Sequence, residues 1–203
     1  MFLVLMAAIA FSCEDDSTEH VSFVTTYPII DLKGPHVLTQ PLGTEFVDPA
    51  EAKVGDETVE LKATGTVDAN TPGVYTINYS ATNKDGFART DARQVVVYDP
   101  ATDAVDMTGS YLRAATGVTV NVVKVSPSTY HIDDAAGFGS NFLDVLFVNT
   151  TGDELVIPTQ VAPSSGITVT TATDTGLITP TGFQWVLNCS AVYGTSTRVF
   201  TKL

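Results

Sequence analysis

Basic residues are scarce in this sequence. Lysine and arginine together number 10 against 23 aspartate and glutamate residues, which gives the 203-residue chain a net charge of −13. Proteins that bind nucleic acid need a basic surface for the phosphates, so nucleic acid is excluded as a partner. Solubility and repulsion between neighbouring molecules explain the acidity, and the alternative is a cationic partner or Ca²⁺.

Histidine and cysteine are scarce as well, with three and two residues. No His-x-x-x-His or Cys-x-x-Cys spacing occurs in the sequence, so we expect no zinc site and assign no metal-binding residue. The sequence also lacks a P-loop, a dinucleotide fingerprint and a Gly-x-Ser-x-Gly nucleophile elbow. We therefore expect no cofactor and no catalytic residue, and we predict that the protein is not an enzyme.

Charged side chains are missing altogether from the first twelve residues, MFLVLMAAIAFS. These residues are too few to cross a bilayer as a helix, which takes about 20 residues. Their length is typical of the apolar region of a secretory signal. Residues 1–12 are therefore predicted to be a signal peptide.

Cys13 follows the apolar run directly. Cys189 is an unconvincing disulfide partner, because it lies in a strand-like stretch and secreted proteins that rely on disulfides carry more cysteines. The stretch 10–13, Ala-Phe-Ser-Cys, resembles a bacterial lipobox, in which the signal is cut before the cysteine and the cysteine is lipidated. This resemblance implies a lipid anchor in a membrane, since each buried CH₂ of an acyl chain contributes about 0.8 kcal/mol. The alternative is a secreted protein in which Cys13 is incidental.

Three acidic residues, Glu14, Asp15 and Asp16, come immediately after the cysteine. An acidic cluster in this place resembles the export signal of surface lipoproteins in the Bacteroides group, which implies the outer face of the outer membrane. The alternative role of the cluster is simple solvation of a tether. We assign residues 13–26 to the lipidated cysteine and this polar, acidic tether.

Beyond the tether the chain is rich in strand and turn signals and has no apolar pattern of helical period. The clearest strand is predicted over residues 74–81, where Tyr75, Ile77 and Tyr79 alternate with polar residues. This period of two indicates a strand with one face buried in the core and the other exposed to solvent. Asp85-Gly86 is a hairpin signal, after which the chain returns through residues 93–98.

Four segments of this first half carry a family resemblance: IIDLKG, LGTEFVDPAEA, TPGVYTINYSATNKDGFA and RQVVVYD. Together they resemble the bacterial surface immunoglobulin-like domain, which also occurs in some pesticidal crystal proteins and is related to hyalin repeats. The resemblance covers residues 27–99. It implies a β-sandwich of about seven strands that serves as a spacer or binding module, with no catalytic residue.

After a linker at residues 100–104, the second half continues as a β series. Strands are predicted at 117–125, 129–132, 142–148, 154–157, 167–173, 182–188 and 198–202. Such a series predicts an antiparallel β-barrel or β-sandwich over residues 105–203, so the whole chain is predicted to be all-β. The domain order is similar to that of a family of Bacteroides surface lipoproteins, some of which lie near glycan-uptake systems. This implies a glycan ligand and an outer-membrane transporter complex as partners.

The stretch YHIDDAAGFGSNF, residues 130–142, is the most suggestive of a site. The adjacent carboxylates of Asp133 and Asp134 fit acid–base chemistry or metal binding. The alternative is a strand that ends in a polar turn, where aspartate and glycine are common.

Aromatic residues are the other candidates for ligand contacts, because a ring can pack against the apolar face of a sugar. Phe138 and Tyr193 lie in glycine-flanked turns and are expected to be exposed. Trp185 shares a strand face with Phe183 and Leu187, which indicates a core position, with ligand binding as the alternative.

The sequence thus leads to a non-catalytic, lipid-anchored protein of the outer-membrane surface that binds a glycan or assists its uptake. The first alternative is a structural or adhesion protein that binds a protein partner. The second is an enzyme, which would need a pocket with close carboxylates or a His-paired nucleophile.

Overall fold

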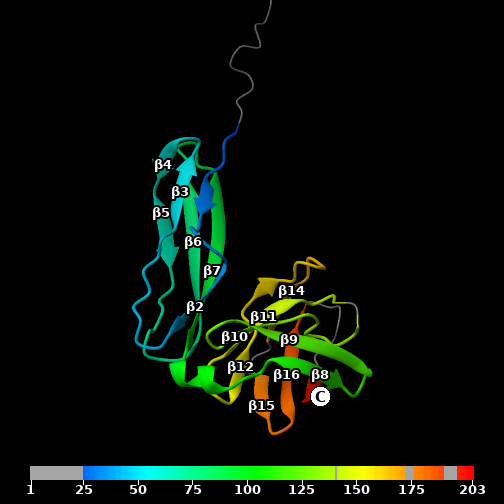
Figure 1. Ribbon diagram of the computed structural model, residues 1–203. Helices are drawn as coiled ribbons and strands as arrows, with labels where there is room; N and C mark the ends of the chain where they lie inside the picture. Colours follow the sequence, from blue (N-terminus) through cyan, green and yellow to red (C-terminus); the bar gives the residue numbers. More distant parts are fainter. Residues whose placement is uncertain (1–24, 140, 172–175, 190–195) are drawn as a thin grey trace, which may run out of the picture.

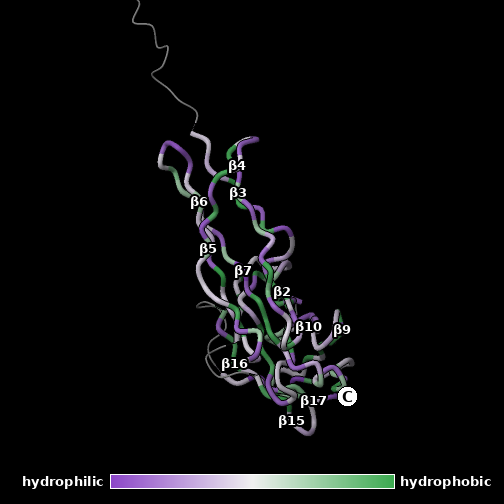
Figure 2. Tube along the Cα trace, turned by 90° about the vertical axis from the view of Figure 1, so that its left-hand side faces the viewer, coloured by the Kyte–Doolittle hydropathy of each residue, from purple (hydrophilic) through white to green (hydrophobic). Residues whose placement is uncertain are grey.

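The computed structural model describes residues 25–139, 141–171, 176–189 and 196–203. Strands make up 53% of the chain and helix 3%, so the predicted all-β class is confirmed. Two β domains lie end to end (Figure 1), and a view turned by 90° shows the same arrangement (Figure 2). Among the residues described, no helix is long and apolar enough to cross a membrane.

The N-terminal domain is a sandwich of two sheets, as expected for an immunoglobulin-like domain. The three-stranded sheet has the order β1-β3-β4, and the four-stranded sheet has the order β2-β7-β6-β5. The β2–β7 pair is parallel, and the other neighbours are antiparallel. The strands are β1 Ile29–Asp31, β2 Val37–Pro41, β3 Glu51–Val54, β4 Glu57–Val59, β5 Leu61–Thr64, β6 Gly73–Thr82 and β7 Ala88–Tyr98.

The β6–β7 hairpin is the longest element of this sandwich. Its register runs from Gly73 opposite Val97 to Thr82 opposite Ala88. The alternation predicted from the sequence is confirmed, since β6 buries Ile77 and keeps the residues on either side of it exposed. Ten residues of strand span about 33 Å, which sets the length of the domain.

The chain enters this domain at the end opposite the barrel. The side-chain amide of Asn83, in the β6–β7 turn, donates to the Thr26 carbonyl at 2.7 Å. The C-terminal end of β7 instead leads into the second domain (Figure 1). The domain therefore separates the N-terminal entry point from the barrel by about the length of β6.

The C-terminal domain is a closed antiparallel barrel of eight strands. Of the two architectures that the sequence predicted, a barrel or a sandwich, the barrel is therefore the correct one. The ring order is β8-β9-β10-β11-β12-β15-β16-β17, and β17 pairs back onto β8. The short β13 and β14 extend from β16 outside the ring. The bounds are β8 Gly109–Arg113, β9 Val118–Ser126, β10 Thr129–Ile132, β11 Val145–Asn149, β12 Glu154–Val156, β13 Gln160–Val161, β14 Thr168–Thr171, β15 Gly176–Thr179, β16 Gly182–Asn188 and β17 Thr197–Lys202.

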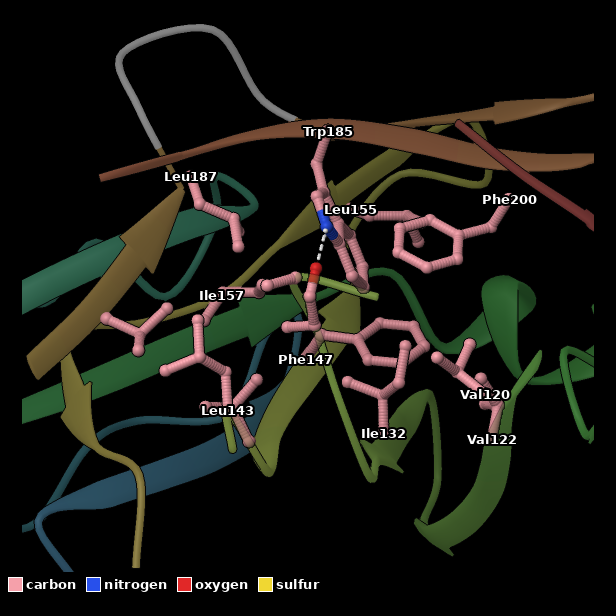
Figure 3. Packing of buried hydrophobic residues seen from close by; sticks show 14 of the residues in the cluster. Val120, Val122, Ile132, Leu143, Phe147, Leu155, Ile157, Trp185, Leu187 and Phe200 are labelled. Carbon is pink, nitrogen blue, oxygen red and sulfur yellow. Dashed lines mark hydrogen bonds between the residues drawn. The ribbon is translucent and has the colours of Figure 1, made fainter. Parts of the chain in front are cut away.

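Side chains fill the interior of the barrel (Figure 3). The side chain of Trp185, on β16, points into the centre of the barrel. The centroid of its ring lies 4.7 Å from that of the Phe183 ring, 5.4 Å from that of Phe147 and 5.6 Å from that of Phe200. The interior of an eight-stranded barrel is just wide enough for side chains to fill, and in this barrel they fill it. Binding is therefore expected at the ends or on the outer wall of the barrel.

The connection between the domains is a short 3-10 helix, η1 Pro100–Ala104, that is docked on the barrel. The Thr102 hydroxyl is buried and donates to the carbonyl of Asn149 at 3.0 Å. Beside it, Val96 and Tyr98 of β7 pack against Val148 and Val156 of the barrel.

Residues 100–104 were predicted to be a linker. The contacts of η1 and β7 with the barrel fix this segment in place between the two domains. The three hydrophobic clusters of the described chain draw on residues 30–200, so a fragment that begins at Thr25 keeps them complete.

Candidate functional site

The β10–β11 loop crosses one end of the barrel and contains most of the residues that the sequence singled out. The Asp134 carboxylate organises this loop and is buried, with 1% of the residue exposed. Its Oδ1 accepts backbone N–H groups of Ala136 and Gly137, each at 3.0 Å. Its Oδ2 accepts those of Phe138 and Gly139, each at 2.8 Å. One side chain thus fixes the path of four consecutive residues.

Asp133 serves a different element. Its Oδ1 accepts the backbone N–H of Asn121 and its Oδ2 accepts the Asn121 side-chain amide, both at 2.9 Å. The two carboxylates are therefore engaged in strand and turn hydrogen bonds and do not form an acid–base pair, as the alternative interpretation of this stretch held. Within the described parts of the chain, no group of three or more His, Cys, Asp or Glu side chains is placed to hold a metal ion.

Trp185 supports the same loop from within the barrel. Its indole N–H donates to the Ala135 carbonyl at 2.9 Å (Figure 3). With 1% of the residue exposed, the ring offers no surface to a ligand. This corrects the interpretation of Trp185 as a ligand-binding residue and confirms its core position.

Phe138 is the exposed aromatic residue of the loop, with 44% of its surface accessible. Glycines flank it on both sides, and both have positive φ, +64° at Gly137 and +91° at Gly139. An added Cβ at Gly137 would lie 2.6 Å from Cδ of Arg113, so the loop can pass over this arginine because residue 137 is glycine. The expected exposure of Phe138 is therefore explained by the close packing beneath it.

Two arginines lie beneath this loop, and sequence reasoning missed both. Arg113 ends β8 with 7% of the residue exposed, and its Nη1 donates to the Ala136 carbonyl at 2.8 Å. Its guanidinium carbon lies 4.8 Å from the centroid of the Phe138 ring, a cation–π contact. Arg198 of β17 is fully buried and donates from Nη1 to the Ser196 carbonyl at 3.0 Å.

Burial is the main cause of the electrostatic behaviour of both arginines. It lowers the pKa of Arg113, and the negative charge of Asp134 opposes this shift. Burial also lowers the pKa of Arg198; Cys189 and Asp134 oppose this shift, and the positive charge of Arg113 adds to it. The two cations therefore act on each other and share the influence of one carboxylate.

The pattern that could have revealed these arginines is the alternation of their strands. Arg113 falls on the same face of β8 as the buried Tyr111, and Arg198 falls on the same face of β17 as the buried Phe200. Basic residues in core-facing positions are rare in ordinary strands. Tyr193, Cys13 and the acidic residues 14–16 lie outside the described residues.

Several hollows occur elsewhere on the described surface, including two that border the N-terminal domain. One, of about 980 Å³, lies at the entry end of the N-terminal domain, where the rings of Tyr27 and Phe87 are 5.4 Å apart. The other, of about 360 Å³, lies between the domains and is lined by residues that include Gln94 and Glu154. Neither contains a buried charge beside an exposed ring, as the barrel end does.

Residues 30–97 match the family model described as "Bacterial surface protein, Ig-like domain". This confirms the family resemblance of the N-terminal domain, which lies within that range except for the first and last residues of its strands. Among curated proteins, none matches the chain.

Solved structures with some likeness include a lipoprotein from Bacteroides thetaiotaomicron, 23% identical, with 87% of this chain and 100% of that chain covered and a TM-score of 0.36. Two structures of Clostridium perfringens ZmpB, one with a catalytic domain and two carbohydrate-binding modules and one with a module in complex with GlcNAc, are each 14% identical with a TM-score of 0.32. The alignments cover 87% and 86% of this chain but 21% and 41% of those chains. At these TM-scores the likenesses carry no argument about function.

Proposed function

We propose that this protein is a non-catalytic, lipid-anchored protein of the outer cell surface that binds a glycan at the Phe138 end of its barrel. The observation that carries the proposal is the exposed Phe138 ring, held by a loop whose backbone is fixed at four positions by Asp134. Binding sites commonly combine an aromatic surface with a few well-placed polar groups. Sugars offer an apolar ring face and hydroxyl groups that suit such a combination.

Preorganisation supports this assignment. A ligand that orders a mobile loop loses part of its binding free energy to that ordering. Here Asp134 fixes the loop from one side, and the Thr116 hydroxyl donates to the Gly137 carbonyl at 2.7 Å from the other. The Phe138 ring therefore needs little further ordering when a sugar packs on it.

The two ends of the N-terminal domain support its role as a spacer. The chain enters at the β6–β7 turn, and the barrel is fixed to the opposite end through η1. A lipid on Cys13, followed by the acidic export signal at residues 14–16, would hold the entry end near the membrane. The barrel would then stand away from the membrane by the tether plus a domain about 33 Å long.

The anchor is tested by replacing Cys13 with alanine. We expect the variant to leave the membrane fraction almost completely, because the thioether-linked lipid is lost, while wild type stays in that fraction. Fractionation of cells followed by immunoblotting measures this. Cys189→Ala is the matched control and should remain with the membrane, and retention of the Cys13 variant there would refute lipidation at this residue.

The ligand site is tested by replacing Phe138 with alanine in fragment 25–203. We expect glycans that bind the wild-type fragment on an array to bind the variant at least about tenfold more weakly, as for other central aromatic contacts. Phe87→Ala, which removes a half-exposed ring from the N-terminal domain, is the matched control and should bind as wild type does. Equal binding by the Phe138 variant would remove this residue from the site.

A protein partner is the second candidate function, and the outer wall of the barrel favours it. Val123 and Val125 of β9 are 53% and 57% exposed, which is unusual for two valines so close together on a strand. An outer-membrane transporter component is the partner we propose for this surface. Co-purification of such a component without any glycan, and its loss in a Val123→Ser, Val125→Ser variant, would favour this role.

A further inference from the structure

The unsatisfied polar atoms of the barrel end point to a more specific ligand. Both hydrogen bonds that Arg113 makes within the described residues come from Nη1, to the Ala136 carbonyl at 2.8 Å and to the Gly137 carbonyl at 3.5 Å. Its Nε is buried and has no hydrogen-bond partner there. Buried donors in folded proteins are nearly always paired, so an orphaned one calls for an explanation.

The geometry of the guanidinium group identifies what is unused. Nη1 occupies one end of the planar fork, so the side that carries Nε and Nη2 makes no hydrogen bond within the described chain. That side presents two parallel N–H groups. A carboxylate binds such a pair in a bidentate manner, with two short, charge-assisted hydrogen bonds.

The charges around Arg113 favour an anion as well. Arg198 lies close enough for its charge and that of Arg113 to act on each other, and Asp134 is the carboxylate that acts on both. The oxygens of Asp134 already accept two backbone N–H groups each. A ligand carboxylate would add a second negative charge beside Arg113, whose neighbour Asp134 also acts on Arg198.

The position of Phe138 indicates which kind of anion fits. Its ring is 44% exposed and lies directly over the Arg113 guanidinium, 4.8 Å from centroid to Cζ. The Arg113 guanidinium therefore lies directly beneath a ring that is partly exposed at the surface. The ligand needs an apolar face for the ring and a carboxylate a few ångströms away, which a pyranose with a carboxyl group provides.

We infer that this end of the barrel recognises an acidic sugar, whose carboxylate binds the Nε–Nη2 side of Arg113 while its pyranose ring packs on Phe138. This inference rests on the proposed glycan-binding function and names the class of glycan. The net charge of −13 fits a local recognition, because the chain as a whole does not attract anions over a distance. The preference for acidic over neutral sugars must then come from the bidentate contact between the carboxylate and Arg113.

The test compares each acidic sugar with its own methyl ester, which keeps the ring and hydroxyls and removes the charge. Fragment 25–203 is titrated calorimetrically with trigalacturonate, a hyaluronan tetrasaccharide and sialyllactose, and with the methyl ester of each. We expect at least one acid to bind about tenfold or more tightly than its ester. Comparison of the three acids separates uronic acids from sialic acid as the source of the carboxylate.

Variants assign the preference to Arg113. Arg113→Gln should bring the affinity ratio of acid to ester close to one, and Arg113→Lys should lower it, because lysine keeps the charge but cannot bind in a bidentate manner. Phe138→Ala should weaken acid and ester alike and so keep the ratio. Arg89→Gln, at an exposed position of β7, is the matched control and should change neither affinity.

Each outcome decides the inference. Equal binding of acid and ester by the wild type, or an unchanged ratio in the Arg113 variants, overturns it. Binding of neutral glycans without any binding of acids overturns the inference and leaves the proposed function standing. Failure of every glycan, neutral or acidic, to bind the folded fragment overturns the proposed function itself. If Arg113→Gln does not fold by circular dichroism, the wild-type ratio and Arg113→Lys still decide.

Discussion

Replacing Asp134 with alanine should lower the free energy of unfolding of the barrel by about 3–5 kcal/mol and abolish glycan binding. The variant leaves four backbone N–H groups without their acceptor and removes a carboxylate that acts on two buried cations. Removing one partner from a buried charged network has effects of this size. Urea unfolding followed by tryptophan fluorescence reports on the barrel, because the single tryptophan lies in its core.

Asp133→Ala is the matched control, since it removes a neighbouring carboxylate of the same loop. It loses only the two hydrogen bonds to Asn121, so we expect a loss of about 1–2 kcal/mol and normal binding. Asp134→Asn should fall between the two, because an amide keeps the shape but loses the charge and one acceptor. A stable Asp134→Ala variant that still binds would show that the loop does not depend on this residue.

Replacing Trp185 with alanine should destabilise the barrel by about 3–5 kcal/mol, the usual range for a large buried aromatic residue. The ring touches Phe147, Phe183 and Phe200, so its removal leaves a cavity at the centre of the barrel (Figure 3). Thermal unfolding followed by circular dichroism measures the effect. Phe87→Ala, at a half-exposed ring, should cost less than about 1 kcal/mol.

Trp185→Phe separates packing from loop support. Phenylalanine keeps much of the aromatic packing but cannot donate to the Ala135 carbonyl, which would lose a buried partner. We expect a smaller destabilisation, of about 1–3 kcal/mol, together with weaker glycan binding. Wild-type stability of Trp185→Ala would contradict the packed core described above.

The N-terminal domain could be predicted from the sequence because its signals are local. The alternation of Tyr75, Ile77 and Tyr79 and the Asp85-Gly86 turn specify the β6–β7 hairpin without help from distant residues. The family segments then supply the rest of the sandwich, and the match over residues 30–97 agrees with them.

The barrel was less predictable because its closure depends on distant pairings. Strand β17 pairs with β16 on one side and with β8 on the other, and the β17–β8 pairing joins Thr201 to Leu112, near the two ends of the domain's chain. Turn spacing and alternation do not contain that information. The strand at 176–179 was not predicted, because its four residues are too few to show an alternation of their own.

The candidate site was predicted in part. The glycines around Phe138 correctly indicated an exposed turn, because their positive φ values are a local property. Alternation could have indicated that Arg113 and Arg198 lie on the buried faces of their strands, but only the closed ring brings these two strands together at the same end of the barrel. The docking of η1 was missed as well, because the barrel partners of Thr102 are distant in sequence: Ser128 lies in the β9–β10 turn and Asn149 lies in β11.

Chemical-shift mapping of fragment 25–203 with the tightest glycan found on the array tests the central claim most directly. We predict that the amide signals that shift belong to residues 113–117 and 133–139, around Arg113 and Phe138. Shifts centred instead on the hollow beside Tyr27 and Phe87, or on the crevice lined by Gln94 and Glu154, would contradict the assignment of the binding site to the barrel end.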